Sequence, residues 1–96
     1  MSERRFSKTK GGDVFIDESG WRASFIASPF THGAYVLTAQ SPDKRWFFGL
    51  APETGYLIEL RHKPNEARIG QFLTDCMSGK IVDKTMASLT SLRAPS

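Results

Sequence analysis

The feature that most constrains the fold of this chain is a change in hydrophobic period near residue 64. Across residues 13–62, short segments rich in β-branched and aromatic residues alternate with clusters of Gly, Pro, Ser and Asp, which is the pattern of strands joined by turns. From residue 64 onward, the apolar residues recur at the spacing of an amphipathic helix. A series of strands followed by a helix predicts an α+β domain.

We expect five strands, at residues 13–17, 21–27, 34–40, 45–51 and 56–62. Short connections join antiparallel neighbours, so the simplest topology is a five-stranded antiparallel meander, either open or curled into a half-barrel. Pro42 presets φ at the second position of the turn between the third and fourth strands, and Gly55 supplies a positive φ at the end of the next turn.

The amphipathic helix is expected between Pro64 and Gly79. Its apolar stripe consists of Ile69, Phe72, Leu73, Cys76 and Met77. Asn65 is the expected N-cap, and Gly79 stands where a glycine ends a helix. We therefore expect a C-terminal helix that packs on one face of the sheet. Residues 80 onward fit a second short helix or a strand equally well.

The chain is expected to form one domain at residues 13–93, because 96 residues suffice for one core of two packed layers and no linker divides them. Residues 1–12 show no helix or strand period and are expected to be a flexible basic tail. Its basic residues are Arg4, Arg5, Lys8 and Lys10. The tail carries the whole formal charge of +3, so the rest of the chain is neutral. Residues 94–96 are expected to be a disordered C-terminus.

The expected sheet is apolar on both faces. With Ala51 opposite Tyr56, one face holds Val36, Thr38, Phe47, Gly49, Tyr56, Ile58 and Leu60, and the other holds Tyr35, Leu37, Ala39, Trp46, Phe48, Leu50 and Leu57. One helix covers only one face. The other face then needs the C-terminal segment, barrel closure, a second subunit or a ligand to cover it. A slip of one residue at either turn would exchange these assignments.

The chain offers little for catalysis or metal binding. His32 and His62, the two histidines, lie in a loop and at a strand end, without the closely spaced partners of a metal site. Glu59 is the one mid-strand carboxylate and is expected to pair with Arg61 or Arg22, or to lie on the rim. We expect no enzyme activity, no cofactor and no metal.

Cys76, the single cysteine, lies on the apolar stripe of the expected helix. It is expected to be buried and unreactive, because free cysteines usually pack as small apolar side chains. A chain with one cysteine forms no internal disulfide, which fits a reducing compartment. No apolar run approaches the length of a membrane span. A cytoplasmic location is therefore expected.

The surplus apolar face is the main functional indication. It favours a small non-catalytic binding module, of the adaptor, regulator or inhibitor type, that acts through protein–protein contacts. The expected contact residues are the aromatic anchors Trp21, Tyr35, Trp46 and Phe48, with Arg45, Arg61 and Lys63 as charges at the rim. The partner is either another protein or a second copy in a homodimer.

The alternative is a single-stranded nucleic-acid-binding protein. The same aromatic side chains would stack on bases, and the basic arm of Arg4, Arg5, Lys8 and Lys10 would neutralise phosphates. No octapeptide of the RNP type and no GXXG loop supports this alternative. Because the chain outside the arm is neutral, a protein interface is favoured.

Overall fold

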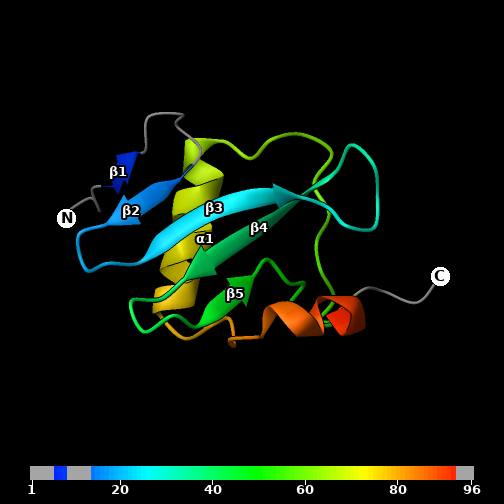
Figure 1. Cartoon of the computed structure of the whole chain (residues 1–96). Coiled ribbons are helices and arrows are strands. Elements are labelled where there is room, and N and C mark those ends of the chain that lie inside the picture. Colours follow the sequence, from blue (N-terminus) through cyan, green and yellow to red (C-terminus); the bar gives the residue numbers. More distant parts are fainter. Residues whose placement is uncertain (1–5, 9–13, 93–96) are drawn as a thin grey trace.

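The computed structural model describes residues 6–8 and 14–92. It contains one antiparallel sheet with the strand order β1-β2-β3-β4-β5, followed by one α-helix and one 3-10 helix (Figure 1). The elements are β1 (Phe6–Lys8), β2 (Phe15–Asp17), β3 (Arg22–Ala27), β4 (Tyr35–Gln40), β5 (Trp46–Phe48), α1 (Glu66–Met77) and η1 (Met86–Leu92). The prediction of an α+β domain with an antiparallel sheet is confirmed.

The strands at the two edges of the sheet differ from the expected ones. Residues 56–62 do not form the expected fifth strand, because the chain leaves the edge of the sheet after Phe48 and makes only isolated bridges when it returns. The expectation of a flexible tail is wrong for Phe6–Lys8, which pair with β2 as the strand β1. Three residues are too few to show a strand period. The rest of residues 1–12, and residues 94–96, lie outside the described residues.

The turn between β4 and β5 determines which side chains share a face. The N–H of Lys44 donates to the carbonyl of Ser41 (2.9 Å), and the N–H of Ser41 donates to the carbonyl of Arg45 (3.0 Å). Lys44 has a φ of 72°, the left-handed conformation of a bulge residue after a type I turn. The bulge adds one residue to the second strand, so Gln40 lies opposite Trp46.

This one-residue shift corrects the expected face assignments. Thr38 pairs with Phe48 and Ala39 with Phe47. Thr38 therefore shares a face with Phe48 rather than with Phe47, and Phe47 lies on the face of Ala39. The register expected for a four-residue connection failed because Lys44 adopts a positive φ that its residue type does not signal.

The next turn forms as predicted. Gly55 has a φ of 76°, and the N–H of Ala51 donates to the carbonyl of Tyr56 (2.9 Å). The expected register continues where Leu50 forms a bridge with Leu57 and the N–H of Ile58 donates to the carbonyl of Gly49 (2.9 Å), but it does not extend to β5. Leu60 forms a bridge with Tyr35 of β4, and Trp46 forms a bridge with Lys84. On its side away from β4, Trp46 therefore pairs with Lys84 and not with a residue of the strand expected at residues 56–62.

The helix α1 begins and ends where the sequence predicts. The Asn65 side chain accepts a hydrogen bond from the N–H of Arg68 (2.8 Å). At the other end, Gly79 has a φ of 86°, and its N–H donates to the carbonyl of Cys76 (3.3 Å). The helix is not the C-terminal element, because η1 follows it.

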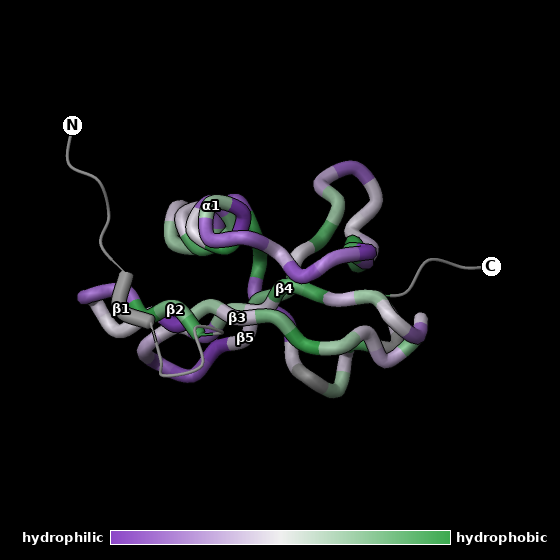
Figure 2. Tube along the Cα trace, turned by 90° about the horizontal axis from the view of Figure 1, so that it is seen from above, coloured by the Kyte–Doolittle hydropathy of each residue, from purple (hydrophilic) through white to green (hydrophobic). Residues whose placement is uncertain are grey.

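The main core lies between α1 and one face of the sheet. Its buried members are Phe15, Ala23, Leu37, Ala39, Phe47, Ile69, Phe72, Leu73 and Cys76. Figure 2 shows α1 on one side of the sheet. We call the opposite side, which α1 does not cover, the helix-free face. Part of that face is also closed, because Val36 and Phe48 have no exposed surface.

A candidate binding surface on the helix-free face

Strand pairing identifies the residues of the helix-free face. Ser24 lies opposite Thr38, which lies opposite Phe48, and Gln40 lies opposite Trp46. Because side chains alternate along a strand, Arg22 and Ile26 of β3 lie on the same face as Ser24. These residues come from three neighbouring strands, so one continuous patch crosses β3, β4 and β5.

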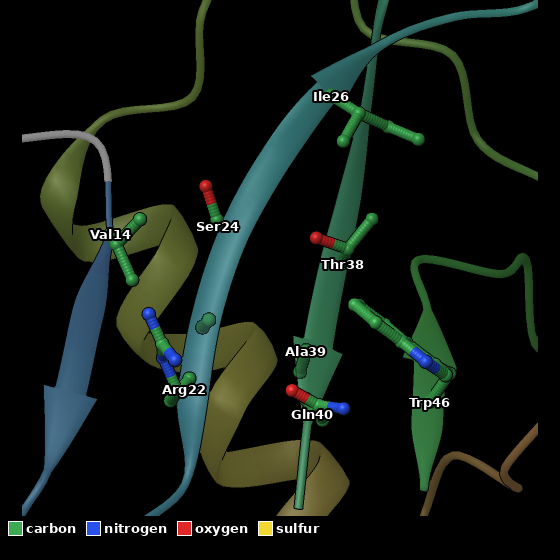
Figure 3. Close-up of a pocket in the computed structure, with 9 residues that line it drawn as sticks. Val14, Arg22, Ser24, Ile26, Thr38, Ala39, Gln40 and Trp46 are labelled. Atoms are coloured by element: carbon green, nitrogen blue, oxygen red, sulfur yellow. The ribbon is translucent and has the colours of Figure 1, made fainter. Parts of the chain in front are cut away.

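The face carries a hollow of about 300 Å³. It is lined by Val14, Arg22, Ala23, Ser24, Ile26, Thr38, Ala39, Gln40 and Trp46. Figure 3 shows Trp46 reaching from β5 toward Thr38, with Val14 and Arg22 on the far side of the hollow. Thr38 is buried, while Trp46 and Ile26 are half-buried. An apolar group of a partner would therefore pack against Trp46 and Ile26, with the buried Thr38 beneath it.

The charge around the hollow is small and positive. Of the described residues that line it, Arg22 is the one with a charge, and its side chain is exposed. No described carboxylate is paired with the Arg22 guanidinium. Ser24 and Gln40 add neutral polar groups to the lining. The hollow therefore combines an apolar seat with polar groups able to orient a bound partner.

The structure separates the four aromatic residues that the sequence predicts as contacts. Trp46 lies at the hollow, and Phe48 lies on the same face but is fully buried. Trp21 packs on Phe47 of the main core, with ring centroids 5.2 Å apart. Tyr35 packs edge-on against Phe25, with centroids 5.7 Å apart.

The predicted rim charges lie elsewhere as well. Arg45 Nε is 3.0 Å from the carboxylate of Asp43, and the Arg45 guanidinium lies 5.9 Å from the ring of Phe47. A hydrogen bond from the Ser41 hydroxyl, helped by Arg45, lowers the pKa of Asp43. Arg61 and Lys63 are exposed in the loop before α1 and line a different hollow.

Of the predicted basic arm, Arg4, Arg5 and Lys10 lie outside the described residues. Lys8 belongs to β1 at the edge of the sheet.

The described residues show no arrangement typical of catalysis. Burial, with a smaller contribution from the charge of Asp75, raises the pKa of the Cys76 thiol to about 12, so the thiolate is scarce near neutral pH. Glu59 accepts a hydrogen bond from the Ser28 hydroxyl. Within residues 14–92, no cluster of three His, Cys, Asp or Glu side chains could hold a metal ion. None of the described helices is long and apolar enough to cross a membrane.

Sequence reasoning missed most residues of the hollow. Val14, Arg22, Ser24 and Ile26 are not among the expected contacts, because the expected faces include no residue of the first two strands. The β3 residues reach this face through their pairing with β4, and Trp46 joins them through the positive φ of Lys44, which no sequence signal marks.

Comparison with protein families, with curated proteins and with solved structures finds no match to this chain. Function is therefore inferred from the geometry and chemistry of its surfaces.

Proposed function

We propose that this chain is a small non-catalytic protein-binding module, of the adaptor, regulator or inhibitor type, that seats an apolar side chain of its partner between Trp46 and Ile26. The observation that supports this proposal is the hollow of about 300 Å³ on the helix-free face. Among the described residues, α1 packs only on the other face.

Burial of Trp46 supplies the main driving force in this proposal. An aromatic side chain buries roughly 150–250 Å² when it is fully covered, and each Å² of apolar surface contributes about 25 cal/mol. Trp46 is half-buried in the free chain, so part of that area is still available. Tryptophan is among the residues most often found as an energetic hot spot of protein interfaces.

The polar groups of the hollow give the contact its orientation. Arg22 offers a charged donor at one side, and Gln40 offers an amide next to Trp46. We expect the partner to present an apolar side chain next to a carboxylate or a carbonyl group, because an unpaired donor at the edge of an interface costs binding energy.

A single-stranded nucleic acid is a less suitable occupant of the same hollow. Base stacking on a sheet uses successive exposed aromatic rings. Among the described residues, Trp46 is the only aromatic residue that lines the hollow, and Arg22 is the only cation. A cytoplasmic location is part of the proposal, because a chain with one free cysteine fits a reducing compartment.

The test is a quantitative pull-down with three variants. Trp46→Ala and Ile26→Ser alter the hollow, and Lys63→Ala is the matched control on the loop before α1. We expect the first two variants to weaken capture of the partner at least tenfold and Lys63→Ala to bind as the wild type, with unchanged circular dichroism in all three. Wild-type capture by Trp46→Ala and Ile26→Ser would refute the proposal.

Two further measurements identify the kind of partner. Sedimentation gives the molecular mass, and a dimer that Trp46→Ala dissociates would make a second copy the occupant. Titration with a fluorescent oligonucleotide at increasing salt tests the nucleic-acid alternative. If a nucleic acid binds, the logarithm of its binding constant should fall linearly with the logarithm of the salt concentration. If the wild type binds the oligonucleotide and Trp46→Ala does not, a nucleic acid and not a protein is the occupant of the hollow.

A further inference from the structure

A second cavity lies on the other side of the molecule, between α1 and the hairpin of residues 50–57. Its volume is about 550 Å³, within the usual range of small-molecule sites. It is lined by Leu50, Ala51, Pro52, Gly55, Asp75, Lys80, Ile81, Val82 and Lys84. We call this cavity the α1–hairpin groove.

The groove has an apolar floor that extends inward. A narrower cleft of about 180 Å³ shares Leu50, Pro52, Asp75 and Ile81 with it. The inner cleft is also lined by the apolar Ile58 and Phe72 and by the polar Arg68 and Gln71 of α1. A linear apolar chain that enters beside Ile81 would therefore meet Ile58 and Phe72, next to polar side chains of α1.

The outer wall of the groove exposes an unusual amount of apolar surface. Val82 is 64% exposed, the most of any large apolar side chain among the described residues. It lies next to Ile81, which is half-buried against the main core. A ligand that covers Val82 would remove this apolar surface from water.

The charged residues of the groove favour an anion. Lys80 and Lys84 both line it, and neither is paired with a described carboxylate. Asp75, the one acidic side chain among the described lining residues, accepts a hydrogen bond from the Gln71 amide (3.0 Å). Two ammonium groups beside an apolar floor complement a ligand with a negative head and an apolar body.

We propose that the α1–hairpin groove binds a small amphipathic carboxylate with a linear apolar chain. The carboxylate lies between Lys80 and Lys84, and the chain runs over Leu50 and Ile81 toward Phe72. This site shares no lining residue with the helix-free hollow, and the two meet only where the N–H of Lys84 donates to the carbonyl of Trp46 (2.8 Å).

The probe for this site is octanoate, with 1-octanol as the neutral control of equal chain length. Titration of the ¹⁵N-labelled protein at low ionic strength is expected to shift the amide signals of residues 50–55 and 80–84. Octanoate should bind more tightly than octanol. Decanoate should bind more tightly than octanoate, by up to about fourfold for each added methylene that is buried.

The double variant Lys80→Gln/Lys84→Gln tests the charges, and Lys63→Gln is the matched control. The double variant should weaken octanoate binding about three- to tenfold, the range for two partly exposed ion pairs, and leave octanol binding unchanged. Lys63→Gln should change neither. Three results with the wild type would overturn the proposal: no octanoate binding, equal affinities for octanoate and octanol, or signal shifts confined to the helix-free face. A fourth is a loss of octanoate affinity in Lys63→Gln as large as the loss in the double variant. The first three results are measured on the wild-type protein, so they do not depend on the folding of a variant.

Discussion

Trp46 lies directly opposite Gln40 in the ladder between β4 and β5, one residue away from the pairing that a four-residue connection would give. The cause is Lys44, which is held at a φ of 72° as the bulge residue of the turn. This shift puts Trp46 on the helix-free face and sends Phe47 into the main core. A conformation at one exposed residue thus decides which aromatic side chain is left for binding.

Replacement of Lys44 by glycine is expected to stabilise the fold. A left-handed conformation costs a residue with a side chain roughly 1–2 kcal/mol, and glycine avoids that cost while losing more entropy on folding. We expect Lys44→Gly to raise the free energy of unfolding by about 0.5–1 kcal/mol, measured by urea denaturation. Lys63→Gly, in a loop without a positive φ, should not raise it. A loss of stability in Lys44→Gly would contradict the bulge assignment.

The buried thiol of Cys76 should make stability depend on pH above neutrality. Burial raises its pKa from the ordinary 9.0 to about 12. Between these values the unfolded chain loses the thiol proton and the folded chain keeps it, so the unfolded state binds fewer protons and the free energy of unfolding falls as pH rises. Well below pH 9 the thiol is protonated in both states and contributes no pH dependence.

The measurement is urea denaturation of the wild type and Cys76→Ala from pH 8 to pH 11. The wild type should lose more stability than the variant across this range, although other groups also titrate in it. Parallel pH profiles would show that Cys76 ionises alike in both states. In the native wild type at pH 8, the thiol should react with a disulfide reagent only as fast as the structure opens.

The Ser28 hydroxyl should stabilise the loop between β3 and β4. It accepts hydrogen bonds from the N–H groups of Phe30 (3.1 Å) and Thr31 (3.2 Å), and it donates to Glu59. Ser28→Ala leaves these partners without the hydroxyl, so we expect a loss of about 1–2 kcal/mol in the free energy of unfolding.

The control for Ser28 is Ser91→Ala in η1. Ser91 is exposed, and its hydroxyl donates one hydrogen bond to the carbonyl of Ser88. Its loss should change the free energy of unfolding by less than about 0.5 kcal/mol, as is usual at the surface. Equal effects of the two substitutions would show that the Ser28 contacts do not hold the loop.

Elements with local sequence signals could be predicted. The helix α1 is specified by its own apolar stripe, by Asn65 at its start and by Gly79 at its end, and all three signals lie within the helix and its caps. The turn at Gly55 is specified in the same way, because glycine is the residue that accepts its positive φ.

Features that depend on distant partners could not be predicted. Leu60 forms a bridge with Tyr35 rather than extending a strand along β5, and no pattern within residues 56–62 indicates that choice. Of the candidate site, Trp46 could be predicted as an aromatic contact residue, but Ile26 could not. Ile26 lies on the same face because it pairs with Val36 of β4, and Trp46 joins that face only through the register set by Lys44.

The central claim is that the helix-free face is the protein-binding surface, and the two tryptophans provide a direct test of it. Trp46 lines the hollow, whereas Trp21 packs on Phe47 on the other face. The two indole N–H signals, assigned with Trp46→Phe, can be followed by NMR as the captured partner is added. We predict that the Trp46 signal shifts and becomes protected from solvent while the Trp21 signal stays in place. A shift of Trp21 alone, or of neither signal on a bound complex, would contradict the claim.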